Sequence, residues 1–139
     1  MKSGFVLVLL LVLSVSAGAE GKGLPGQRET AEVGGVKVSA TLLQPATSGS
    51  RTIDFELVMT THMGALPSDM LKVAKLLEKQ GQVLMPIAWS GGGGGHHLSG
   101  KLSFPAESAS LNGTYTLLLQ GINGPNDLRF EWTTTIGGV

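Results

Sequence analysis

Hydrophobic and polar residues alternate with a period of two over most of the chain beyond residue 35. The first run covers residues 36–42, where Val and Leu positions alternate with Lys, Ser and Thr. Successive side chains of a strand point to opposite faces, so each run of this kind predicts a strand with one buried face. The same alternation recurs at residues 53–59, 97–104, 115–119 and 128–132.

The pattern between residues 68 and 89 allows two interpretations. Ser68 is a candidate N-cap for a helical turn at 69–71, and apolar residues spaced three apart extend such a helix to residue 77. We favour a strand over 73–78, joined by a tight turn to a second strand over 83–89 in a hairpin. Short apolar runs do not separate these interpretations, so both stay open.

About seven short strands with turn signals roughly every ten residues are typical of an all-β, immunoglobulin-like β-sandwich. A small barrel is the main alternative. We assign this domain to residues 36–135. The polar, Gly-rich segment 20–35 is expected to form a flexible N-terminal arm.

Residues 1–19 have the features of a cleaved signal helix. Lys2 supplies a positive charge, Phe5–Val15 is almost entirely apolar, and Ala17-Gly18-Ala19 supplies small residues for signal peptidase. The apolar run is shorter than the roughly 20 residues of a spanning helix. We therefore expect a periplasmic or secreted protein that starts near Glu20. The chain has no Cys to carry a lipid, so no membrane anchor is expected in the mature form.

The charge balance excludes several classes of partner. The chain has 10 basic and 10 acidic residues. Cleavage after residue 19 removes one lysine and leaves 9 against 10. A balance this even, without a cluster of Lys or Arg, argues against nucleic acid and against an anionic membrane surface as partners.

The candidate chemistry lies around a run of five glycines at 91–95. His96 and His97 follow this run. The remaining histidine, His62, stands at the end of a predicted strand. Imidazole is the commonest metal ligand, and loops at strand ends are where a sandwich presents its sites. Adjacent residues of a regular strand point to opposite faces. His96 and His97 therefore reach one ion only if the glycines make the backbone irregular.

Met63, Met59 or Asp69 is expected to complete a site built from these histidines. A thioether ligand favours Cu(I), whereas a carboxylate favours Zn(II) or Cu(II). The alternative is that the histidines pack on Trp89 and hold the glycine loop, while the methionines fill the core.

No enzymatic machinery is predicted. The chain has no Cys nucleophile and no G-x-S-x-G motif. Asp54 and Glu56 stand on alternate positions of a predicted strand, which is typical of a solvated face. The glycine run lacks the Lys-Ser/Thr ending of a phosphate loop.

The sequence resembles a group of small exported bacterial proteins that are mostly uncharacterised. The resemblance depends on the glycines, the run His96–Phe104, the pair Thr61-His62 and the closing segment Arg129–Trp132. The resemblance covers residues 53–132, about two thirds of the mature chain. It implies an export-associated β-sandwich in which the histidines are linked. The apolar residues 63–67 depart from the more polar segment expected there, which counts against a carboxylate ligand at that point.

These observations predict an exported binding protein that holds a transition metal ion, copper first and zinc second. His62, His96 and His97 are the expected ligands, with Met63 as an accessory. The alternative is a metal-free, immunoglobulin-like interaction module that docks another exported protein.

Overall fold

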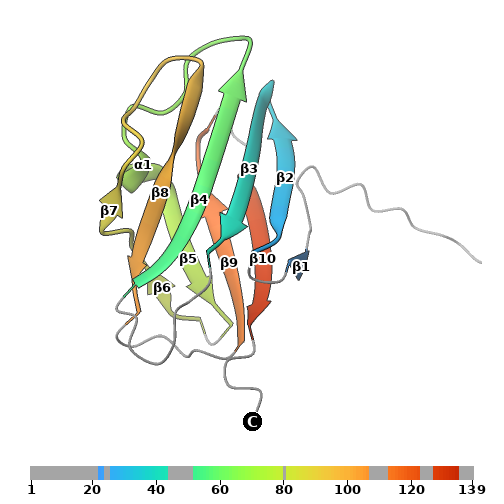
Figure 1. Ribbon diagram of the computed structural model, residues 1–139, viewed down its shortest axis with the longest axis vertical. Helices are drawn as coiled ribbons and strands as arrows, with labels where there is room; N and C mark the ends of the chain where they lie inside the picture. The colour runs from blue at the N-terminus through green and yellow to red at the C-terminus, as the bar shows by residue number, and fades with distance from the viewer. Residues whose placement is uncertain are drawn as a thin grey trace, which may run out of the picture.

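A computed structural model describes residues 22–23, 26–43, 52–79, 81–106, 113–122 and 127–134. Two sheets lie face to face with a hydrophobic core between them (Figure 1). The predicted signal peptide at 1–19 lies outside the described residues.

The first sheet is antiparallel throughout, with the strand order β2-β3-β4-β8-β7. Its strands are β2 (Arg28–Val33), β3 (Val36–Leu42), β4 (Thr52–Thr61), β7 (Ala88–Trp89) and β8 (His97–Pro105). It lies toward the viewer in Figure 1.

The second sheet has the order β1-β10-β9-β5-β6, and all its strand pairs are antiparallel except β1 with β10. Its strands are β1 (Lys22–Gly23), β5 (Ala74–Glu78), β6 (Val83–Leu84), β9 (Gly113–Leu119) and β10 (Leu128–Thr134). Among the described strands, seven have five residues or more, and β1, β6 and β7 have two residues each. The predicted all-β sandwich of about seven strands is therefore confirmed. The third long strand, β4, stays beside β3, whereas the third strand of a constant immunoglobulin domain lies in the opposite sheet.

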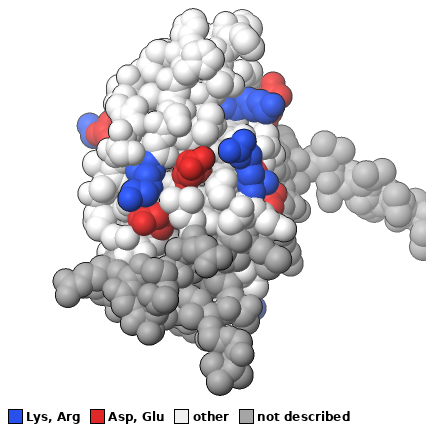
Figure 2. All heavy atoms as spheres, viewed as in Figure 1, with Lys and Arg blue, Asp and Glu red and all other residues white. Residues whose placement is uncertain are grey.

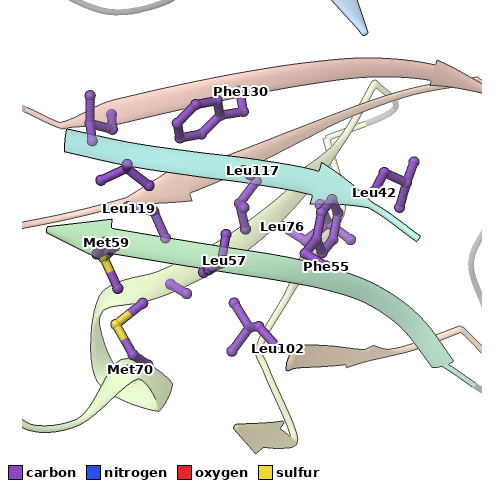
Figure 3. Close-up of a cluster of buried hydrophobic side chains, with 14 of the residues drawn as sticks. Leu42, Phe55, Leu57, Met59, Met70, Leu76, Leu102, Leu117, Leu119 and Phe130 are labelled. Atoms are coloured by element: carbon purple, nitrogen blue, oxygen red, sulfur yellow. The ribbon is translucent and has the colours of Figure 1, made fainter. Parts of the chain in front are cut away.

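The alternation of residue types explains the layers. In β3 and β4 every second residue is buried, and these side chains meet the inward residues of β5, β9 and β10 (Figure 3). Phe55 and Trp132 are fully buried and come from opposite sheets, with ring centroids 5.1 Å apart. The rows of inward apolar residues therefore determine which face of each sheet is internal.

Strand β2 corrects the expectation for residues 20–35. Residues 28–33 are not part of a flexible arm but pair with residues 36–41 of β3. Gly34 and Gly35 form the hairpin turn between them, with φ of +54° and +80°. A Gly-Gly pair between two runs of residues is a hairpin signal, so the sequence did carry the information.

Residues 69–89 differ in part from expectation. The favoured strand is present as β5, preceded by a single helical turn, α1 (Met70–Val73). Asp69, not Ser68, caps this turn, because its carboxylate accepts a hydrogen bond from the Leu71 N–H at 3.0 Å. Among the described residues, no helix is long and apolar enough to cross a membrane.

The expected strand over 83–89 is interrupted. β6 pairs with β5 in one sheet, and β7 pairs with β8 in the other, so the chain crosses between the sheet edges at residues 85–87. Pro86 lies in the middle of this crossing. Proline has no N–H to give to a strand ladder, which explains the break.

Candidate functional site

The pairing of β4 with β8 brings the three histidines to one end of the sandwich, at the top of Figure 1. Thr60 pairs with His97, and the next backbone bond runs from the Thr61 N–H to the His96 carbonyl at 3.0 Å. His62 follows directly. All three histidine side chains are exposed. The expected grouping of these residues at strand ends is therefore present in the backbone.

His97 faces the outer side of the first sheet, and His62 lies just beyond the end of β4. Thr61 and Leu98 are buried, so the residues next to them in the ladder, Thr60 and His97, face outward. His62 stands two residues beyond Thr60 and is also exposed. Because β4 ends at Thr61 and the chain bends at His62, the alternation of the strand does not set the direction of the His62 side chain.

His96 owes its exposure to the glycines before it. In a regular strand His96 would point inward like its neighbour Thr61, which is buried. Gly94 and Gly95 both have φ of +74°, a conformation that other residues rarely adopt. The backbone therefore leaves regular strand geometry before His96, and both His96 and His97 reach solvent, as their expected role as joint ligands requires.

Other glycines of the loop allow close backbone contacts. A Cβ at Gly93 would overlap the Ser68 carbonyl, and one at Gly91 would overlap the Trp89 ring. The Trp89 indole N–H also donates to the Gly92 carbonyl at 2.6 Å. Trp89 therefore holds this loop through a bond to its backbone, whereas the alternative interpretation expected the histidines to hold it.

Two further backbone bonds join the glycine loop to the loop after β4. The Leu66 N–H donates to the Gly95 carbonyl, and the Gly94 N–H donates to the Pro67 carbonyl, both at 2.9 Å. The loop that carries His62 is therefore held against the loop that carries His96. Figure 2 shows no Lys, Arg, Asp or Glu over the uppermost part of this face, although Lys37 is exposed on β3 and pairs with Thr60 in the row that contains His97.

Met63 is held out in solvent. The Thr61 hydroxyl accepts a hydrogen bond from the Met63 N–H at 3.2 Å and donates one to the Met63 carbonyl at 2.7 Å. These bonds turn the backbone at His62, and the Met63 side chain is 74% exposed. Thr61 is itself buried, so the sandwich fixes the backbone from which Met63 projects.

The other two residues considered as ligands have different roles. Met59 is fully buried and points into the core, as does Met70 (Figure 3). The Asp69 carboxylate caps α1. Within the described part of the chain, no three His, Asp or Glu side chains lie close enough together to hold a metal ion.

A second polar cluster lies at the opposite end, on the inner face of the second sheet. Glu78, Tyr115 and Trp132 form one row across β5, β9 and β10. The Glu78 Oε1, the Tyr115 hydroxyl and the Trp132 indole nitrogen are buried without a hydrogen-bond partner. Burial raises the pKa of Glu78. Burial, and then the charge of Glu78, raise the pKa of Tyr115. Sequence analysis missed this row because only the strand register brings the three residues together.

Replacing Glu78 by glutamine is expected to lower the pKa of Tyr115 while leaving it above the ordinary value of about 10. The substitution removes the negative charge but not the burial, which is the larger cause. Tyr115 is the single tyrosine of the chain, so tyrosinate absorbance in an alkaline titration reports on it alone. Glu131→Gln, on the outer face of β10, is the matched control and should leave the titration unchanged. An unchanged titration in Glu78→Gln would show that the two side chains do not interact.

Comparison with protein-family models, with curated proteins and with solved structures finds no match for this chain. The resemblance described from the sequence therefore stays a prediction.

Proposed function

We propose that this chain is an exported binding protein that holds one transition metal ion at the upper end of β4 and β8. His62 and His97 are the principal ligands, and His96 and Met63 complete the site. Copper is the first candidate and zinc the second. The observation that supports the proposal best is the register, because Thr60 pairs with His97 and His62 follows two residues later at the same end of the sandwich.

Binding requires that the exposed side chains rotate toward one ion. Ordering a side chain costs about 0.5–1.5 kcal/mol, so three or four ligands cost a few kcal/mol together. A micromolar dissociation constant corresponds to about 8 kcal/mol, and metal–imidazole bonds are strong enough to supply that and the ordering cost. The backbone bonds between the two loops keep the remaining conformational cost small.

The ligand types favour copper over zinc. Imidazole binds both ions, but the thioether of Met63 is a soft ligand that favours Cu(I).

Calorimetric titration of Cu(I), Cu(II) and Zn(II) into the purified chain tests the proposal. We expect about one ion per chain, and His62→Ala and His97→Ala should each weaken binding roughly tenfold or more. Acidification should weaken it too, because protons compete for the imidazole nitrogens. Ser99→Ala, two residues beyond His97 on the same strand, is the matched control. Absence of binding by the unaltered chain, or binding that neither His substitution weakens, would rule the site out.

The alternative function is metal-free docking of another exported protein, and a cluster of exposed apolar residues at positions 83–87 favours it. Thermal unfolding separates the two functions. A metal ion that binds the folded state raises the melting temperature, whereas an interaction module with structural histidines shows no change.

A further inference from the structure

Exposed apolar side chains cluster where the chain crosses from β6 to β7. Val83, Met85 and Ile87 alternate along this segment and are 50%, 49% and 58% exposed. Leu71 of α1 is 37% exposed, and α1 lies beside β7 (Figure 1). The described part of the chain has five exposed large hydrophobic residues. Four of them are the residues just named, and the fifth is Met63. Single exposed apolar residues are ordinary, whereas a contiguous group marks an interaction site.

The apolar group continues onto the outer face of the second sheet. Val83 pairs with Leu77, and Leu77 is the outward residue between the buried Leu76 and the inward Glu78. Leu77 pairs with Thr116 of β9, and Leu118 stands two residues further along that strand. Leu118 is buried although it is not part of the hydrophobic core between the sheets. We call the surface formed by Leu71, Leu77, Val83, Met85 and Ile87 the apolar seam.

Basic side chains border the apolar seam. Lys75 stands two residues before Leu77 in β5 and on the same side of the sheet, and Lys79 follows directly after the end of β5. Lys75 shares a row with Leu118 and Arg129. Lys72 is exposed on α1. Glu131 is the one acidic residue at an outward position of β5, β9 or β10 among the residues the structure describes. The outer face of the first sheet differs, since Arg28, Glu56 and Lys101 alternate in sign there and Arg28 pairs with Glu56 at 3.9 Å.

We infer that the apolar seam docks a segment of another protein that carries apolar side chains flanked by acidic ones. The apolar side chains supply the buried area, and the lysines around the seam select the acidic flanks. Strand addition at this edge is disfavoured, because Pro86 has no N–H and β6 and β7 have two residues each. Recognition therefore depends on side chains.

Two other occupants fit less well. A second copy of this chain would bring the same lysines face to face, and like charges at an interface disfavour association. An anionic membrane attracts clusters of about four to eight basic residues, and the four near the seam, Lys72, Lys75, Lys79 and Arg129, are at the lower end of that range.

Fluorescence anisotropy with two matched peptides tests the inference. One peptide alternates leucine with aspartate, and the other alternates leucine with lysine. We expect the acidic peptide to bind about tenfold tighter or better than the basic one, with affinity falling as salt is added. Met85→Asp and, independently, Ile87→Asp should abolish this binding, and Lys75→Glu should reduce or reverse the preference. Ser99→Asp, a charge placed on the outer face of the first sheet, is the matched control and should bind like the unaltered chain. The titrations are run with chelator, so their outcome is independent of the metal site.

Equal binding of the two peptides, or binding that survives both Met85→Asp and Ile87→Asp, would overturn the inference. Sedimentation tests whether a second copy of this chain occupies the seam, and vesicle binding tests whether a membrane does. A dimer that Met85→Asp disrupts would assign the seam to a second copy. Binding to phosphatidylserine vesicles that the acidic peptide competes away would assign it to a membrane. Circular dichroism of each variant confirms that it is folded.

Discussion

Replacing Phe55 by alanine is expected to lower the free energy of unfolding by about 3–5 kcal/mol, the range for removing a large aromatic side chain from a core. Phe55 is fully buried in β4. Its ring lies edge-on to Phe104 of the same sheet, at 5.8 Å between centroids, and 5.1 Å from Trp132 of the opposite sheet. Alanine would leave a cavity between the layers, because the two neighbouring rings are held by different sheets. Urea denaturation measures the change.

Val58→Ala is the matched control for Phe55→Ala. Val58 lies on the same strand but at an outward position, between the buried Leu57 and Met59. The expected loss there is about 1 kcal/mol or less, because an outward position contributes strand propensity and little packing. Similar losses for the two variants would mean that Phe55 does not join the sheets.

Replacing Gly93 by alanine is expected to lower the free energy of unfolding by about 2–3 kcal/mol, near the upper end of the range for overpacking. The new Cβ would overlap the Ser68 carbonyl, which is backbone and has no rotamer with which to move aside. The neighbouring bonds, from Gly94 to Pro67 and from Leu66 to Gly95, hold the two loops at this distance. Relief of the overlap would therefore break these bonds and move His96 away from His62.

Gly81→Ala separates steric overlap from backbone preference. Gly81 has φ of +92° and open space where a Cβ would stand, so alanine there costs about 1 kcal/mol of conformational strain alone. We expect Gly93→Ala to be the more destabilising variant and to weaken metal binding, while Gly81→Ala leaves metal binding unchanged. If Gly93→Ala were no more harmful than Gly81→Ala, the contact between the loops would not constrain Gly93.

The long strands were predictable because their determinant is local. Val36–Leu42 and Thr52–Thr61 alternate buried and less buried residues as the sequence pattern requires. The assignment failed where the local signal was weak or was overridden. Arg28–Val33 has two buried apolar residues, Ala31 and Val33, and its strand depends on the Gly-Gly turn and on pairing with β3. The segment 83–89 has an apolar pattern, but Pro86 divides it between two sheets.

The candidate site was predictable in its residue types and only partly in its geometry. Histidines next to strand ends and to a glycine run pointed to the upper end of the sandwich. The sequence could not exclude Met59 and Asp69 as metal ligands. The burial of Met59 in the core depends on tertiary packing, and the capping role of Asp69 depends on the local backbone conformation. The row of Glu78, Tyr115 and Trp132 joins residues far apart in the chain, so no sequence window contains it.

The sequence by itself determined the all-β class, the inward face of the long strands and the residue types at the histidine end. Side-chain alternation and glycine conformation act within a few residues, so both can be inferred from the sequence. The tertiary structure alone decided that β4 pairs with β8, that His62 and His97 thereby come to the same end of the sandwich, and that the apolar seam lies among lysines. Strand order and register depend on contacts between distant segments, and many pairings bury similar apolar area. The packing of the two sheets selects one of them.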